Sequence, residues 1–414
     1  MKSRFFVLFI CLLATVAIVG CDLFGKDDDD SVLTGSTGTI VGNILNEAGS
    51  AIASSLTVTG GNKSVDTTTG AFTLENAAID GNGKIFLTIK GSGYINTYAV
   101  EALNAGQKVV ATYTIRAVPA GATQNYTTLN TNAVKAVNIA GRAEIDIATG
   151  SIINSTTKAA VSSADITIVH TMPKADSKAL DTFPGIFAGI PTGGTTEVPF
   201  ETFGFVYVDL GDGNELDPSK PATLTMPIDP AMVAAAPATM PLWSYDTTKG
   251  QWIQEGTATK IGSNYIAQVT HFSWYNLDRP LGDDVRTLEV TVASYSWSYE
   301  DHILEEEGTT NTDKTDLTKR IANARVVVTA TLAEGENGAG FSSGDTATWK
   351  EVKSTNSNGV VTFNAIPSKR RIAIEVTTQS GATTNGYGYE VENGVAKSFI
   401  NMGGFQGHGT FNKR

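Results

Sequence analysis

The sequence predicts an all-β protein, in which tandem antiparallel β-sandwich domains follow a signal peptide and a flexible acidic tether. Glycine is abundant, at 42 of 414 residues. Threonine is frequent, and apolar residues alternate over short segments instead of recurring at helical spacing. Many short strands joined by glycine-containing turns are typical of sandwiches.

The first twenty residues have the layout of a secretory signal peptide. Lys2 and Arg4 precede the apolar run Phe5–Val19, and Gly20 and Cys21 follow it. The run is shorter than the roughly 20 apolar residues that a spanning helix needs. We therefore expect residues 1–20 to be a leader that is removed after export.

The residues around the expected cleavage point carry a more specific signal. Ile18, Val19, Gly20 and Cys21 resemble the lipobox of bacterial lipoprotein precursors. The resemblance implies that the Cys21 thiol receives a diacylglycerol and becomes the first residue of the mature protein. The alternatives are a plain signal peptide, or an uncleaved helix, with a coincidental cysteine.

A lipid anchor places the protein at the cell envelope, where each buried methylene contributes about 0.8 kcal/mol to attachment. We expect the outer membrane, at its periplasmic face or at the cell surface. The inner membrane stays open, because in enterobacteria an aspartate directly after the lipidated cysteine, here Asp22, tends to retain lipoproteins there.

Residues 21–37 predict a solvated tether, because the run Asp27–Asp30 concentrates like charges that repel one another. Removing the leader, which carries two basic residues and no acids, lowers the formal charge from −12 to −14. Such an acidic surface disfavours nucleic acid as a partner. Only two cysteines exist, Cys11 and Cys21; the first is removed with the leader and the second carries the lipid, so no disulfide is expected.

The first domain is expected at 38–118, where strand and turn signals alternate. In order, these signals are Gly38–Leu45, Asn46–Gly49, Thr69–Leu74, Ile85–Ile89, Gly91–Tyr94 and Lys108–Val118. This succession resembles the carboxypeptidase regulatory-like domain, a small transthyretin-like sandwich. The resemblance implies an accessory scaffold that performs no chemistry.

A β-rich middle domain is expected at 130–282. Its second half contains Phe205–Asp209, Leu216–Pro221, Ala222–Ile228, Pro241–Asp246, Gly250–Gly256 and Val269–Asp278. This order is similar to an extracellular region of cartilage intermediate layer proteins and of bacterial surface proteins. The resemblance implies a structural extracellular domain and supplies no catalytic residues.

The third domain is expected at 286–402, followed by a loose tail at 403–414. Leu288, Val290 and Val292 alternate along one strand. The segment Thr355–Pro367 resembles the hairpin signature shared by bacterial Ig-like and regulatory-like domains, in which a glycine makes the turn and a phenylalanine fills the core. Glu300–Asp316 is expected to be a solvated acidic insertion.

Two groups of residues suggest metal sites, and each has a simpler interpretation. His302 and Glu305 have the H-x-x-E spacing of two zinc ligands, with His408 as a distant third, but they lie in the acidic insertion and the tail. A second group is rich in oxygen ligands and glycine: Asp209, Asp212, Asn214, Glu215 and Asp217. Its spacing departs from a calcium loop, so a hairpin turn with exposed acids is favoured, and we expect no bound metal or cofactor.

Five aromatic residues could form a platform for sugar rings: Trp243, Tyr245, Trp252, Trp274 and Tyr275. They fall among alternating apolar neighbours, so core filling is favoured. His271 is read as a structural histidine, and Arg370 and Arg371 as an ordinary basic pair at the start of a strand. Ser, His and Asp residues are scattered along the chain, and the sequence predicts no catalytic residues.

The sequence therefore predicts a non-enzymatic, lipid-anchored envelope protein with a structural or adhesive role. The expected partners are the membrane, through the lipid, and a glycan or an envelope or matrix protein. Two alternatives stay open. A carbohydrate-binding lipoprotein for nutrient capture requires the five aromatic residues to be exposed, and a zinc metallohydrolase requires His302, Glu305 and a third ligand to converge.

Overall fold

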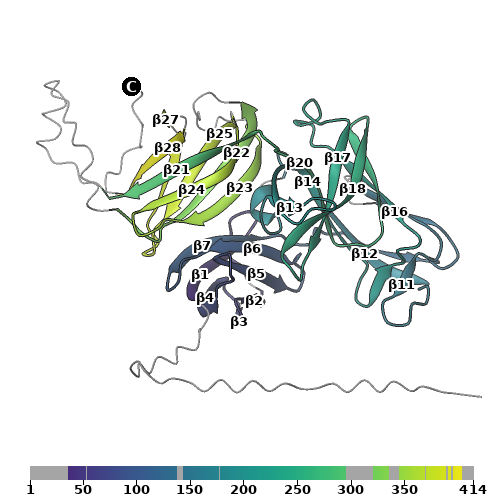
Figure 1. Cartoon of the computed structure of the whole chain (residues 1–414). Coiled ribbons are helices and arrows are strands. Elements are labelled where there is room, and N and C mark those ends of the chain that lie inside the picture. Colours follow the sequence, from purple (N-terminus) through teal and green to yellow (C-terminus); the bar gives the residue numbers. More distant parts are fainter. Residues whose placement is uncertain are drawn as a thin grey trace, which may run out of the picture. The chain divides into compact units, whose positions relative to one another are not determined.

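The structure is a computed structural model that describes residues 36–402 except 53, 138–142, 177, 295–319, 335–344, 369, 388–389 and 393–394. The described residues form β-strands joined by turns, with a short 3-10 helix, η2 (Ala179–Thr182) (Figure 1). The predicted all-β fold class is confirmed. Within the described ranges, no helix has the length and apolarity that crossing a membrane requires. The leader, residues 21–35 with Cys21, the acidic insertion and the tail lie outside these ranges, whereas Thr37, at the end of the expected tether, already belongs to the first strand.

The first module is a sandwich of two sheets. Its strands are β1 (Thr37–Asn46), β2 (Leu56–Gly60), β3 (Lys63–Thr67), β4 (Ala71–Ala78), β5 (Lys84–Gly91), β6 (Thr97–Ala102) and β7 (Lys108–Ile115). One sheet has the order β4-β1-β7 and the other β3-β2-β5-β6. Strands β1 and β7 pair in parallel, and the other pairs are antiparallel. Alternate side chains such as Ile40, Val58 and Ile89 fill the space between the sheets.

The third module repeats this topology. Its strands are β21 (Val285–Ala293), β22 (Arg325–Glu334), β23 (Ala347–Ser354), β24 (Val360–Pro367), β25 (Arg370–Thr377), β26 (Thr383–Tyr387), β27 (Glu390–Glu392) and β28 (Val395–Asn401). The sheets have the orders β24-β21-β28-β27 and β23-β22-β25-β26. Strand β21 takes the place of β1: it pairs antiparallel with β24, in parallel with β28, and has a register shift near its start, as β1 does.

One glycine in each of these modules fixes a turn: Gly70 precedes β4, and Gly359 precedes β24. The Ile44 amide donates to the Gly70 carbonyl at 2.9 Å, and the Val292 amide donates to the Gly359 carbonyl at 2.8 Å. Both glycines have positive φ, and a Cβ on either would collide with the carbonyl oxygen of the facing strand. The turn glycine predicted in Thr355–Pro367 is therefore required by close backbone approach.

The two cores solve the same packing position differently. Gly42 pairs with Phe72 in the first module, and Val290 pairs with Val361 at the corresponding place in the third. A Cβ on Gly42 would overlap the Phe72 ring, so the Phe72 side chain fits only because Gly42 has no side chain. In the third module two medium side chains replace this large and small pair, which conserves volume.

The middle module is built on one large sheet. Its strands are β8 (Thr123–Thr127), β9 (Val134–Val137), β10 (Glu144–Ile147), β11 (Ile152–Asn154), β12 (Ser163–Thr171), β13 (Ala188–Ile190), β14 (Val198–Asp209), β15 (Asn214–Leu216), β16 (Ala222–Pro227), β17 (Thr239–Asp246), β18 (Gln251–Ile261), β19 (Asn264–Val269) and β20 (Trp274–Pro280). The sheet follows the order β8-β12-β14-β20-β17-β18-β19-β16-β10-β9, with β13 against β14 and β18. Strand β8 lies before the expected start at 130, and pairing with β12 makes it part of this sheet.

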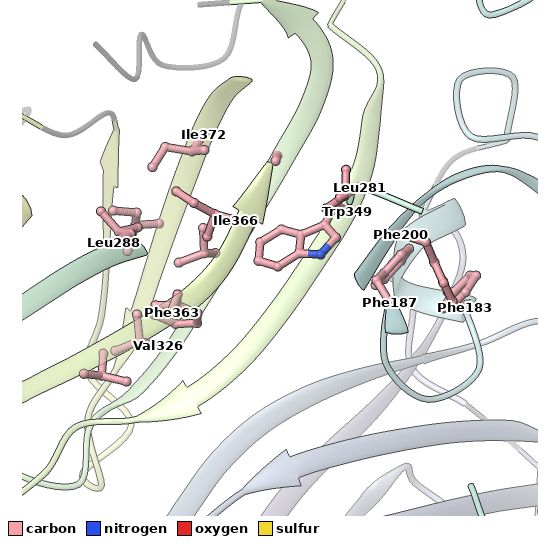
Figure 2. Close-up of a cluster of buried hydrophobic side chains, with 14 of the residues drawn as sticks. Phe183, Phe187, Phe200, Leu281, Leu288, Val326, Trp349, Phe363, Ile366 and Ile372 are labelled. Atoms are coloured by element: carbon pink, nitrogen blue, oxygen red, sulfur yellow. The ribbon is translucent and has the colours of Figure 1, made fainter. Parts of the chain in front are cut away.

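The two faces of the middle sheet have different cores. One face buries a mainly aliphatic cluster, with Ile145, Leu224 and Leu277 among its members. The other buries an aromatic cluster that continues into the third module. In Figure 2, Trp349 of the third module lies between Phe363 and Ile366 of its own sandwich and the group of Phe183, Phe187 and Phe200 from the middle module. The third module is thus packed on the middle one through shared apolar surface.

Candidate functional site at the joints between modules

The first and third modules are joined by a buried ion pair. Glu101 lies on β6, and its side chain is 2% exposed; Arg325 lies on β22, and its side chain is 10% exposed. Arg325 donates from Nε to Glu101 Oε2 at 2.8 Å and from Nη2 to Oε1 at 3.0 Å. The Tyr113 hydroxyl donates to the same carboxylate at 3.2 Å. Burial lowers the pKa of Arg325, but the Glu101 carboxylate outweighs it and holds that pKa above its ordinary value.

Neutral hydrogen bonds extend this joint along the β6 and β23 edges. Gln107 Nε2 donates to Ser354 Oγ at 2.7 Å and to the Asn323 carbonyl at 3.1 Å. Ser354 Oγ in turn donates to the Ala102 carbonyl at 2.7 Å. Asn104 Nδ2 donates to Asn323 Oδ1 at 2.9 Å. Two-point contacts of this kind fix an orientation, which a single contact would leave free.

A second buried carboxylate joins the middle and third modules. Glu201, on β14, is fully buried. Arg370 of β25 donates to it from Nε at 3.0 Å and from Nη2 at 3.2 Å, and Arg279 of β20 forms a further ion pair. Arg370 Nη1 also donates to the Leu332 carbonyl at 2.9 Å. Because two guanidinium groups surround one carboxylate, its desolvation is compensated on both sides.

Two further ion pairs join the middle module to its neighbours. Lys350 Nζ of β23 lies 2.8 Å from Asp181 Oδ1 of η2. Burial raises the pKa of Asp181, but Lys350 and Lys178 together outweigh burial and leave that pKa below its ordinary value. Arg116, just after β7, bonds Thr171 of β12 and lies 3.8 Å from Asp176. Every pair of modules is therefore connected by at least one partly or fully buried charge.

A cavity of about 510 Å³ lies where the three modules meet. Tyr98 and Glu101 line it from β6, Phe183 from the middle module, and Arg325 and Trp349 from the third. Two ion pairs in its wall cross the joints: Glu101 with Arg325, and Asp181 with Lys350.

A third buried carboxyl group, on β20, has no such arginine. The carboxyl oxygens of Asp278, both amide atoms of Asn276 and the indole nitrogen of Trp274 are buried and have no hydrogen-bond partner in the structure. These three residues alternate along β20 and share its aromatic face. Burial raises the pKa of Asp278 well above its usual range, and the neighbouring Thr202 hydroxyl opposes this only in part. Burial therefore favours the neutral form of Asp278 over the charged form.

The five aromatic residues predicted either as a sugar platform or as core are core. Trp243, Trp252 and Tyr275 are fully buried, and Tyr245 and Trp274 are 3% exposed. Trp243 Nε1 donates to the Asp278 carbonyl at 3.1 Å, and Trp252 Nε1 donates to the Pro184 carbonyl at 2.8 Å. The aromatic platform for nutrient capture is therefore wrong, because these rings present no face to solvent.

The acidic turn has local partners for its side chains. Asp209 accepts from the Gly211 amide at 3.2 Å, Asp217 accepts from Ser219, and Glu215 pairs with Lys158. These contacts are those of a turn that caps its own backbone. Across the part of the chain that the structure describes, no three His, Cys, Asp or Glu side chains lie close enough to hold a metal ion. His302, Glu305 and His408 lie outside that part, so the zinc hypothesis stays a prediction.

Two predictions about single basic residues have different outcomes. His271 Nε2 lies 2.8 Å from Glu255 Oε1, and this hydrogen bond raises the pKa of His271 despite partial burial. Arg371 pairs with Asp345 at 3.5 Å. The interpretation of Arg370 as ordinary is wrong, because it binds the buried Glu201.

The sequence contained a signal for the joints. Glu101 and Glu201 are lone charges inside apolar strand segments, where charges are rarely buried without a partner.

Comparisons with known proteins give distant structural similarities. No protein-family model matches the chain, and neither does any curated protein. Among solved structures, the Bacillus anthracis TIE protein is 12% identical with a TM-score of 0.17; the match covers 88% of this chain and 50% of that one, so this chain spans half its length. A Bacteroides fragilis protein described as membrane-associated is 11% identical over 59% of this chain and 97% of its own, with a TM-score of 0.18. The pilus-presented adhesin Spy0125 (Cpa) is 10% identical over 88% and 98%, with a TM-score of 0.13. Scores this low do not establish a shared function.

Proposed function

We propose that this chain is a lipid-anchored protein of the bacterial cell envelope that has a structural or adhesive role and performs no catalysis. The lipid is attached at Cys21, and the residues between Cys21 and the start of β1 at Thr37 tether the folded part to the membrane. The outer membrane is the proposed location, at the periplasmic face or the cell surface. The proposed partners are a glycan or a protein of the envelope or surrounding matrix, and the acidic charge disfavours nucleic acid.

The observation that carries the structural role is the set of buried ion pairs between modules. Interfaces within a chain usually resemble transient ones and permit relative motion. Here Glu101 and Glu201 are removed from water, and each binds an arginine of another module. Separating the modules would take Arg325 from Glu101 and leave Glu201 with Arg279 of its own module, so the three modules are suited to present surfaces in a fixed arrangement.

Metabolic labelling tests the anchor. Cells expressing the full chain are grown with an alkyne analogue of palmitate, and the purified protein is analysed by mass spectrometry. We expect label on Cys21, at the new amino terminus, and none in the Cys21→Ser variant. An intact leader, or a free thiol at Cys21 in the wild-type protein, would contradict the anchor.

A binding experiment tests the adhesive role. Residues 31–414 include all of the compact unit from Gly35 onward. Immobilised on beads, this fragment is expected to retain a defined component of a cell-envelope extract, identified by mass spectrometry and confirmed with the purified component. If no component binds in a purified assay, the role is structural and the adhesive half of the proposal is wrong.

A further inference from the structure

A second cavity lies between the outward face of the first module and the outward face of the third. It has a volume of about 790 Å³, within the roughly 300–1,000 Å³ of small-ligand sites. One wall is β7, and the other is formed by β22, β25 and β26. We call this cavity the threonine cleft because Thr112 and Thr114 face Thr329, Thr377 and Thr383 across it.

Many side chains in the walls of the threonine cleft are short. Besides the threonines, Val110, Val327 and Ala373 line it, together with the charged residues Lys178, Asp181, Arg325, Lys350 and Glu375. The outward face of a sheet ordinarily carries exposed charged residues, whose long side chains would fill such a space. Short side chains leave the cleft open and give it alternating methyl groups and hydroxyl groups.

The cations that line the cleft all have anionic partners. Arg325 is bound to Glu101, which lies outside the cleft lining, and Lys350 and Lys178 both contact Asp181, at 2.8 and 3.5 Å. Glu375 lies 4.0 Å from Arg325 Nη1. Local pairing therefore weakens the attraction of the cleft for a charged ligand, and the cleft offers donors and acceptors to hydroxyl groups.

The cleft is held open by contacts at its edges. The Lys108 amide donates to Gln379 Oε1 at 3.2 Å, which ties the start of β7 to the turn between β25 and β26. The Glu101–Arg325 pair ties the opposite end. Because the site is already formed, ligand binding carries no free-energy cost for bringing the modules together.

We propose that the threonine cleft binds a neutral oligosaccharide chain. This inference rests on the adhesive role proposed above and assigns it a ligand class and a site. A sugar ring presents C–H faces to methyl groups and hydroxyl edges to hydrogen-bonding groups, which is the alternation that the walls carry. The buried aromatic residues of β17, β18 and β20 take no part.

Glycan binding by variants of residues 31–414 tests the site. A printed array of neutral and anionic glycans identifies the best neutral oligosaccharide, and calorimetric titration then measures its affinity. Thr112→Trp and Thr383→Trp, on exposed positions of the two walls, are expected to fill the cleft and weaken binding about tenfold or more. Thr73→Trp is the matched control: Thr73 is exposed on β4, at the other edge of the sheet that contains β7. It is expected to leave affinity unchanged.

Each other outcome overturns the site. It is wrong if no neutral glycan binds, if only anionic glycans or peptides bind, or if the control and both cleft variants bind equally well. Thermal unfolding of each variant shows that it is folded, and the two walls provide independent tests if one variant is not. Failure here leaves palmitate labelling and envelope binding as separate tests, so loss of the glycan site and loss of the adhesive role are distinguishable.

Discussion

The first and third modules share a strand order and differ in the use of their outward faces. The outward face of β2 carries Thr57 and Thr59, which are half-buried and exposed. The corresponding strand β22 carries Arg325 and Val327, which are 8% and 7% exposed. The inward alternation of apolar residues specifies the sandwich in both modules, whereas the outward positions determine what each sandwich docks against.

The largest expected effect comes from breaking the Glu101–Arg325 ion pair, in which β22 of the third module supplies the arginine. Arg325→Met leaves Glu101 buried without a counter-charge, which costs about 3–5 kcal/mol of unfolding free energy. Denaturant unfolding measures the loss. Lys135→Met is the matched control, because Lys135 is 53% exposed beside Glu144 and its pair contributes about 0–1 kcal/mol. Equal losses would show that the buried joint has no special role.

The next effect tests the different cores of the two modules. Gly42→Val introduces atoms into the Phe72 ring and is expected to destabilise the protein by about 1–3 kcal/mol. Adding Phe72→Val reproduces the Val290 and Val361 pair of the third module and should recover most of the loss. Unfolding free energies of both single variants and the double variant measure the coupling. Additive losses in the double variant would refute the equivalence of the two positions.

A smaller effect, a gain of stability, is expected for Asp278, a buried carboxyl group that has no arginine partner as Glu101 has. The folded-state pKa of Asp278 is raised, so its contribution to stability is fully present below the unfolded pKa of about 4 and is lost as pH rises. Asp278→Asn removes this loss. We expect the variant to gain stability relative to the wild type between pH 4 and pH 8, measured by thermal unfolding. A pH-independent difference would mean that Asp278 does not titrate anomalously.

The smallest effect concerns the free outward face of the first module. Thr57 Oγ1 donates to Asp66 at 2.7 Å in an exposed position. Asp66→Ala is expected to change the unfolding free energy by less than about 0.5 kcal/mol, as surface substitutions usually do. A loss approaching that of Arg325→Met would show that β2, like β22, supports a joint.

The sequence predicted the interior of the sandwiches better than the contacts between them. Gly359 and Phe363 took the turn and core positions expected of them, because strand alternation and positive φ leave local marks. Arg370 and Glu201 are separated by 169 residues, and no local pattern connects them. The order of the middle sheet, in which β12 is next to β14 but β16 is next to β10, is equally non-local.

The candidate site shows the same division. The aromatic residues of β17, β18 and β20 were predicted as core from their apolar neighbours, and their burial follows from that pattern. The threonine cleft was not predicted, because threonine is common on any strand. The cavity forms only where strands of the first and third modules face each other. Lone charges within apolar strands were the available but unused indication of joints.

The central claim is that buried ion pairs make the three modules one cooperative body, and calorimetric unfolding of residues 31–414 tests it most directly. The account predicts a single transition whose calorimetric and van't Hoff enthalpies agree. Separate transitions for the first and third modules in the wild-type protein would contradict it.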